Sequence, residues 1–186
     1  YLEALVADLE SALPLIWGRP IISIFFGGGT PSLISAEGID WLLGQIRMRL
    51  KILPGAEITL EANPGTMETA RFAAFRAAGI TRLSLGIQSF NPAHLKALGR
   101  IHGREEAIAA ATLAGEHFDQ FNLDLMYGLP GQTLAEAMAD IETALSFSPE
   151  HLSCYQLTLE PNTHFAAFPP ELPDGDLCAD MQEAVE

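Results

Sequence analysis

Residues 57–63 alternate between polar and apolar side chains: Glu57-Ile58-Thr59-Leu60-Glu61-Ala62-Asn63. Pro64-Gly65 follows at once and ends the segment. A period of two indicates a β-strand, because successive side chains of a strand point to opposite faces of the sheet. One face of this strand is therefore apolar, and the other carries carboxylates, a hydroxyl and an amide.

The same alternation recurs in three later segments, 82–89, 121–127 and 151–160. Their polar or small positions are Ser84, Gly86, Gln88, Asn122, Asp124, Gln156, Thr158 and Glu160. A fifth segment, Ile21–Phe26, is a short apolar run before three glycines. Parallel strands covered by helices on both faces read as nearly continuous apolar runs, which these segments do not. The polar faces are therefore expected to line an interior, where water or a ligand offsets the cost of burying them.

Helical patterns separate the strands. We expect helices over 1–17, 35–50, 66–79, 92–98, 104–117 and 134–147, and a last one near Leu177. Strands alternating with helices at this spacing predict parallel βαβ units and an α/β fold. An open sheet and a barrel both remain possible, but an incompletely closed barrel around a ligand satisfies the polar faces best.

Composition narrows the class of protein. The 186 residues are 48% hydrophobic and 18% charged, which is typical of one globular domain. A net charge of −14 repels phosphate backbones and anionic lipid, so we expect neither a nucleic-acid partner nor stable membrane insertion. The two cysteines, Cys154 and Cys178, fit no metal-ligand spacing and suggest a reducing compartment, so we expect a cytoplasmic protein.

Candidate ligand-binding residues follow the strands. Gly27-Gly28-Gly29 comes directly after the first strand and lets the backbone approach a ligand closely, although tight turns also use glycines. Glu61, Gln88 and Asp124 lie near strand ends on polar faces, and βα loops build active sites at the carboxyl ends of parallel barrel strands. Internal hydrogen bonding is the alternative for each of the three.

Arg100 is one of only ten basic residues, and its guanidinium suits a ligand carboxylate, although a surface ion pair fits equally well. The histidines form no visible metal constellation. A Schiff-base aldolase or lyase is disfavoured, because neither Lys51 nor Lys96 falls at a strand end.

Together these segments resemble the radical S-adenosylmethionine (SAM) family that includes oxygen-independent coproporphyrinogen III oxidases and haem chaperones of the HemW type. The resemblance rests on residues 26–32 (Phe-Gly-Gly-Gly-Thr-Pro-Ser), 61–64 (Glu-Ala-Asn-Pro), 86–90 (Gly-Ile-Gln-Ser-Phe), 98–102 (Leu-Gly-Arg-Ile-His) and 122–132 (Asn-Leu-Asp-Leu-Met-Tyr-Gly-Leu-Pro-Gly-Gln). Residues 155–163 look closer to the chaperone branch. The resemblance covers nearly the whole chain, in order.

The resemblance implies a (βα)6 partial barrel from which the first strand is missing. Residues 1–168 would form the radical SAM core, with strands 2 to 6, and residues 169–186 would start the next, truncated segment. The residues implied to contact SAM, or a second SAM in the oxidase, are Gly28, Gly29, Thr30, Glu61, Gln88, Arg100, Asp124 and Gln156. No catalytic or metal-ligating residue is implied within this chain.

The family's cluster loop, Cys-x3-Cys-x2-Cys, does not occur in these residues. Its three thiolates would hold a four-iron four-sulfur cluster that cleaves SAM reductively, so we expect the ligands upstream of Tyr1. The implied partners are a porphyrinogen or haem and an electron donor to the cluster. The intact protein would then act in haem metabolism, as a haem chaperone by preference or as a coproporphyrinogen oxidase that decarboxylates propionates.

Overall fold

A computed structural model describes residues 1–16, 18–66 and 69–185. Its sheet has five strands in the order β1-β2-β3-β4-β5, and every neighbouring pair is parallel. The strands are β1 (Ile21–Phe26), β2 (Ile52–Ala62), β3 (Arg82–Gln88), β4 (Gln120–Tyr127) and β5 (His151–Gln156). The predicted fold, a partial barrel of parallel strands with outer helices, is confirmed.

The helices connect and cover the strands. They are α1 (Leu2–Ala12), α2 (Ala36–Arg49), α3 (Thr69–Ala77), α4 (Pro92–Ala97), α5 (Arg104–His117), α6 (Leu134–Leu145), α7 (His164–Ala167) and α8 (Gly175–Val185), with short 3-10 turns at Leu13–Leu15, Pro31–Leu33 and Pro64–Thr66. Trp17 and residues 67–68, which fell within predicted helices, lie outside the described residues.

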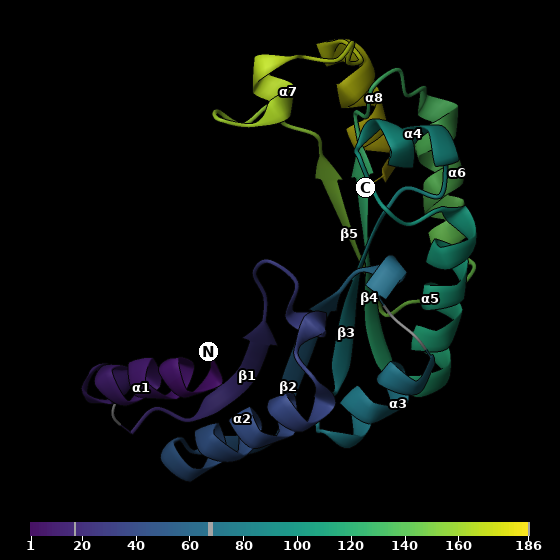
Figure 1. The fold of residues 1–186 in the computed structure, drawn as a ribbon. Helices are drawn as coiled ribbons and strands as arrows, with labels where there is room; N and C mark the ends of the chain where they lie inside the picture. Colours follow the sequence, from purple (N-terminus) through teal and green to yellow (C-terminus); the bar gives the residue numbers. More distant parts are fainter. Residues whose placement is uncertain (17, 67–68, 186) are drawn as a thin grey trace.

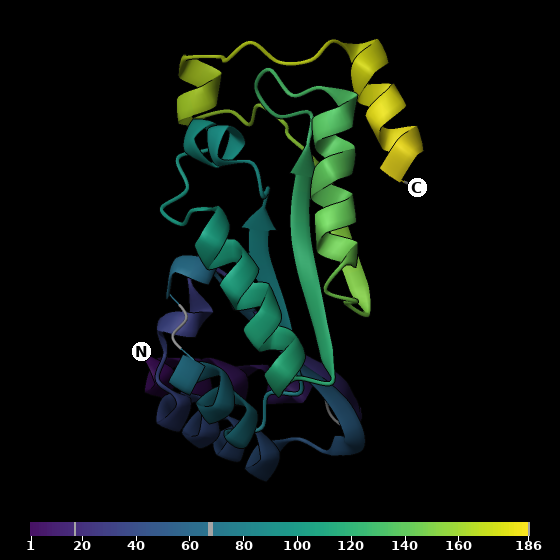
Figure 2. The ribbon, with the colours of Figure 1, turned by 90° about the vertical axis from the view of Figure 1, so that its right-hand side faces the viewer.

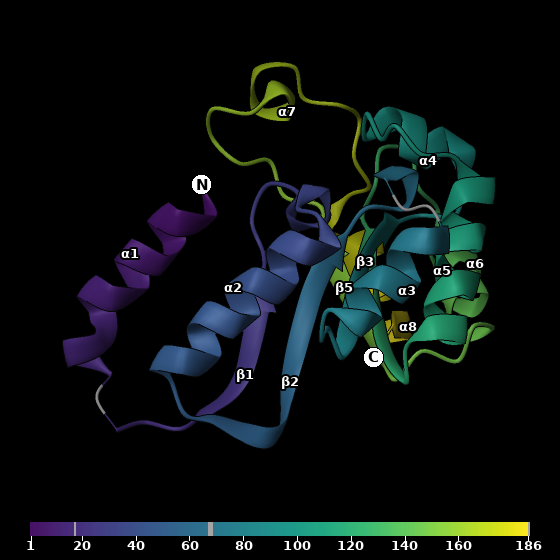
Figure 3. The same ribbon diagram turned by 60° about the horizontal axis from the view of Figure 1, so that its bottom comes forward.

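The sheet curls, and the helices α2, α3, α5 and α6 lie on its convex side (Figure 1). The helices α5 and α6 lie along the sheet next to β3 and β4 (Figure 2), whereas α1 lies apart at the β1 edge, beside α2 (Figure 3). Between the sheet and the helices is a buried core that includes Leu60, Leu83, Leu123 and the α3 side chains Phe72 and Phe75. Burial of each such side chain contributes about 1.5–3 kcal/mol, so the convex layer supplies most of the stability.

Local signals place the helix starts. The Ser35 hydroxyl oxygen accepts from the Gly38 N–H at 3.1 Å, which satisfies one free donor of α2. A capping box starts α6, where Thr133 and Glu136 bond each other's backbone N–H groups. Both starts agree with the sequence pattern.

On the concave face of the sheet, polar residues of neighbouring strands lie side by side. Neighbouring strands align Ser84 with Asn122, Gly86 with Asp124, and Asp124 with Ser153. In β2, β3 and the first part of β4, polar or small side chains occupy this face while apolar ones enter the core, as the alternation predicts. Within the described ranges, no helix is both long and apolar enough to cross a membrane.

Two strand boundaries differ from expectation. The strand β2 begins at Ile52 instead of Glu57, because the segment through Pro54-Gly55 still pairs with β1 across a register shift. The strand β5 ends at Gln156 instead of Glu160. One more bond forms, from the Leu157 N–H to the Tyr127 carbonyl, and β4 then turns at Gly128 with φ +68°, so no ladder remains to extend β5.

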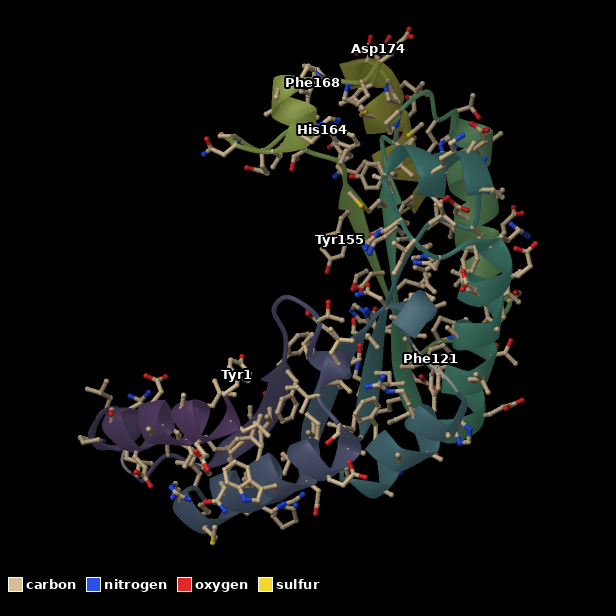
Figure 4. The ribbon with its side chains drawn as sticks, in the orientation of Figure 1. Tyr1, Phe121, Tyr155, His164, Phe168 and Asp174 are labelled. Carbon is tan, nitrogen blue, oxygen red and sulfur yellow. The ribbon has the colours of Figure 1, made fainter. Side chains whose placement is uncertain are left out.

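The alternation of β5 also differs from the predicted one. Ser153 bonds Asn122 on the concave face, while Leu152 and Cys154 pack against the core. Tyr155 therefore belongs to the concave face and Gln156 to the convex one. Figure 4 shows Tyr155 directed into the open side of the curl, whereas Phe121 lies on the helix-covered side.

Candidate functional site

A polar cleft opens at the carboxyl ends of the central strands. Its volume is about 260 Å³, and it is lined by Gly28, Gly29, Pro31, Glu61, Ala62, Asn63, Ser84, Gly86, Gln88, Arg100 and Asp124. These residues come from the loop after β1, from β2, β3 and β4, and from the loop after α4. The topology thus brings side chains that are distant in sequence to one edge of the sheet, where parallel α/β proteins bind ligands.

The glycine loop forms one wall of the cleft. Gly28 has φ +116°, a conformation that a side chain would strain, and its N–H donates to Glu61 Oε2 at 3.2 Å. Glu61 is half-buried at the end of β2 and keeps further acceptor capacity for a ligand. The bond fixes the loop against the strand end and leaves its backbone open to the cleft.

The floor of the cleft lies at Gly86. A Cβ atom built there would lie 3.1 Å from both Asn63 Oδ1 and Gln88 Nε2, so these two amide side chains converge over this glycine. Gln88 has a left-handed backbone with φ +69°, and the register of β3 shifts between Gly86 and Gln88. Two side-chain amides therefore face the cleft, each able to donate and to accept.

Asp124 and Arg100 supply opposite charges. Asp124 accepts from the Ser84 hydroxyl at 3.0 Å and from the Asn122 amide at 2.7 Å, which fixes its carboxylate. Burial lowers the pKa of Arg100, and the charge of Asp124 opposes that shift. A guanidinium stays protonated in proteins, so the cleft holds a fixed cation opposite the carboxylates.

The polar network continues below Asp124. The Asn122 amide also donates to Ser84 Oγ at 2.7 Å, and its oxygen lies 2.6 Å from His151 Nδ1. Burial raises the pKa of the nearby Cys154 thiol, with a smaller contribution from Asp124, so this cysteine is not activated as a nucleophile. The side chains around Asp124 are thus joined in one hydrogen-bonded network.

The structure brings together six of the eight residues expected to bind SAM, namely Gly28, Gly29, Glu61, Gln88, Arg100 and Asp124. Thr30 lies beside the cleft, where its hydroxyl donates to the Gly29 carbonyl at 2.7 Å. Gln156 is not part of the cleft lining. The register of β5 directs its side chain to the convex face of the sheet. Contact of all eight residues with SAM stays a prediction.

Sequence reasoning did not single out Asn63, Ser84 and Gly86 as site residues. Their signal was present, because all three share the polar parity of their strands. Pro31 and Ala62 complete the lining without such a signal, because an apolar side chain at a strand end is equally typical of the core.

A larger cavity, of about 670 Å³, lies between β1, α1 and α2. Its lining is mainly aliphatic and aromatic, and it lacks the converging charges and amides of the polar cleft. We therefore assign the candidate site to the polar cleft, although the other cavity is larger. Among the described residues, no group of three His, Cys, Asp or Glu side chains could hold a metal ion.

Comparison with known proteins identifies the family of the chain. Residues 4–144 match the family described as the radical SAM superfamily, and the chain belongs to that superfamily. The family resemblance expected from the motifs is therefore confirmed.

Two relatives within the superfamily are haem chaperones of the HemW type. The chain is 50% identical over 184 residues to the haem chaperone HemW of Escherichia coli strain K12, covering 98% of this chain and 49% of that protein. It is 53% identical over 183 residues to HemW of Haemophilus influenzae, covering 98% and 48% respectively. The chain thus spans about half the length of these relatives.

The solved structure of coproporphyrinogen III oxidase (HemN) from Escherichia coli superposes with a TM-score of 0.86 at 29% identity. The superposition covers 99% of this chain and 43% of the oxidase. The oxidase is described as a radical SAM enzyme.

Proposed function

We propose that this chain forms the SAM-binding part of a radical SAM protein of haem metabolism, of the haem-chaperone type. The observation that carries the proposal is the 50% identity over 98% of the chain to a haem chaperone, joined to a polar cleft in the expected place. We take residues 1–168 as the radical SAM core and residues 169–186 as the start of the next segment.

The residues of the cleft fit SAM chemically. SAM carries an ammonium, a carboxylate, a ribose and an adenine. Carboxylates accept from an ammonium and from ribose hydroxyls, so Glu61 and Asp124 suit these groups. Arg100 suits the carboxylate because a guanidinium pairs with it bidentately. The Gln88 amide and the open backbone at Gly28 and Gly29 supply the remaining hydrogen bonds.

The residues present do not fit an iron–sulfur cluster. Neither Cys154 nor Cys178 belongs to a Cys-x3-Cys-x2-Cys motif, and the described part of the chain holds no group of three possible metal ligands. These two cysteines therefore do not supply the three thiolates of a cluster. Within the proposal, these residues bind and orient SAM, and the radical chemistry of the family belongs to the complete protein.

An oxidase is the second candidate, because the superposition with coproporphyrinogen III oxidase covers nearly all of this chain. The lower identity, 29% against 50%, favours the chaperone. Both proposals share haem or a porphyrinogen as partner, an electron donor for the cluster and, as a further proposal, a cytoplasmic location.

SAM binding tests the site. The complete protein containing this chain is reconstituted anaerobically and titrated with SAM by calorimetry, beside Glu61→Gln and a remote control, Gly44→Ala on α2. We expect a weaker SAM affinity for Glu61→Gln only, because a neutral amide attracts an ammonium less than a carboxylate does. An unchanged SAM affinity in Glu61→Gln would contradict the proposed placement of SAM in the polar cleft.

Two assays separate the candidate functions. Haem titration followed by absorbance, and anaerobic incubation with coproporphyrinogen followed by chromatography, are run on the same preparation. Stable haem binding without decarboxylation is expected of a chaperone. Turnover of propionates to vinyl groups would assign the protein to the oxidases instead.

A further inference from the structure

The segment that carries Gln88 leaves the regular sheet before it enters the cleft. Gln88 is not a glycine, yet its backbone is left-handed with φ +69°. Non-glycine residues rarely adopt this conformation, and they persist in it only where the surrounding structure fixes them. The contacts that fix this turn therefore also fix the direction of the Gln88 amide.

The main contact comes from the opposite side of the sheet. Asp140, on α6, is 4% exposed. Its Oδ2 accepts from the Ser89 hydroxyl at 2.5 Å, and its Oδ1 accepts from the Phe90 N–H at 2.7 Å. One buried carboxylate thus binds the two residues that directly follow Gln88.

The turn is anchored at further points. Ser89 Oγ accepts from the Asn91 N–H at 2.9 Å, and Arg104 donates to the Phe90 carbonyl at 2.9 Å. On the other side of Gln88, His102 Nε2 lies 3.1 Å from the Ile87 carbonyl. Side chains therefore hold the chain on both sides of Gln88, and Asp140 makes two of these bonds, one to the Phe90 N–H and one to the Ser89 hydroxyl.

Asp140 has no place in the ligand cleft, whose lining does not include it. Burying a carboxylate away from a partner is costly, and burial raises the pKa of Asp140 while its bonds to Ser89 and Phe90 lower it. An apolar residue would pack on this helix face at a lower desolvation cost. Its two bonds to the turn account for a carboxylate at this position.

We propose that Asp140 is a positioning residue for the ligand site: from behind the sheet, it holds the 88–90 turn so that the Gln88 amide points into the cleft. The role of this turn in binding SAM rests on the proposed function. The turn geometry itself does not, because it is fixed by contacts within this chain.

A double-mutant cycle tests the proposal in the complete protein. SAM affinity is measured for Asp140→Ala, for Gln88→Ala and for the double variant, and thermal unfolding is followed in parallel. We expect each single variant to weaken SAM binding by about fivefold, the effect of about one lost hydrogen bond. We expect the double variant to bind as weakly as Gln88→Ala alone, because Asp140 acts through Gln88.

Two further variants separate positioning from general stability. Ala144→Gly lowers the stability of the same helix without touching the turn, so SAM affinity should stay within about twofold of the wild type. Asp140→Asn should recover most of the affinity, since its amide can accept from Phe90 N–H and donate to Ser89 Oγ. Equal losses of affinity in Asp140→Asn and Asp140→Ala would overturn the proposal, as would an additive effect in the double variant.

A structural readout keeps this test separate from the proposed function. In a crystal structure of Asp140→Ala, the Gln88 backbone should leave the left-handed region and its amide should leave the cleft. An unchanged Gln88 would overturn the positioning role. Failure of the wild-type protein to bind SAM, with Gln88 displaced in the variant, would instead refute the proposed function and support the positioning role.

Discussion

Gly86→Ala isolates the contribution of the cleft floor. The new Cβ would lie 3.1 Å from Asn63 Oδ1 and 3.1 Å from Gln88 Nε2. Ordinary contacts lie at about 3.4–4 Å, so both amides must move back by a few tenths of an ångström. Gly86 is not among the left-handed glycines, so alanine itself adds no backbone strain. The effect should fall on the ligand site and not on the fold.

The magnitude follows from the two amides. Each intramolecular or ligand hydrogen bond contributes about 1 kcal/mol, so displacing both costs about 2 kcal/mol of SAM binding, or roughly 30-fold in Kd. Calorimetric titration of the complete protein measures this change, and thermal unfolding measures stability. Gly44→Ala is the matched control, since a Cβ there meets nothing within 4 Å. An affinity within twofold of wild type in Gly86→Ala would refute the proposed geometry.

Three further expectations concern charge, pH and packing. Asp124 accepts its two bonds on different oxygens, so Asp124→Asn keeps one of them and must reverse the other, with its NH2 group donating to Ser84 Oγ. The variant also loses the charge near Arg100, so SAM affinity should fall while stability drops by about 1 kcal/mol, or about 2–4 °C in thermal unfolding; a larger loss of stability than of binding would contradict this. Burial lowers the pKa of His102 in the folded protein. As the pH falls below the ordinary histidine pKa of about 6.5, the unfolded chain therefore binds more protons at this residue than the folded chain does. The stability that neutral His102 contributes is present above that pH and is lost as the pH falls through the folded pKa. In urea unfolding between about pH 5 and 8, His102→Gln should therefore lose less stability toward acid pH than the wild type. Equal losses of stability in the two proteins would exclude His102 as the cause. Phe72→Ala, in the fully buried core, should cost about 3–5 kcal/mol in urea unfolding, and a cost under 1 kcal/mol would contradict the packing described.

The alternation of polar and apolar residues predicts most of the fold. In 57–62 and 82–86 it assigns each side chain to the correct face, because a pleated strand offers only two faces. It fails in β5, where Gln156 was expected inside and Tyr155 lies there instead. The polarity of a side chain does not determine its face where the surroundings are open on both sides, and Tyr155 is 54% exposed.

The site was predictable to a similar extent. Glu61, Gln88 and Asp124 follow from their parity and from the shared edge of parallel strands. The left-handed turn at Gln88 did not follow, because it depends on bonds to Asp140 and Arg104, distant in sequence. No short-range pattern around residue 140 distinguishes a carboxylate that anchors a turn from one that faces solvent.

The two faces of the curled sheet have different roles, so neighbouring residues of one strand serve different purposes. Along β3 and β4, every second side chain belongs to the layer that secures folding, and the residues between them belong to the layer that chooses a ligand. Substitutions of ligand-facing residues leave the packed core layer intact, so ligand selectivity can change while the fold stays the same. Such a division explains in physical terms how a single architecture can host a wide range of reactions, and it identifies Ser84, Gly86 and Asp124, which line the cleft from β3 and β4, as positions at which to begin redesigning selectivity.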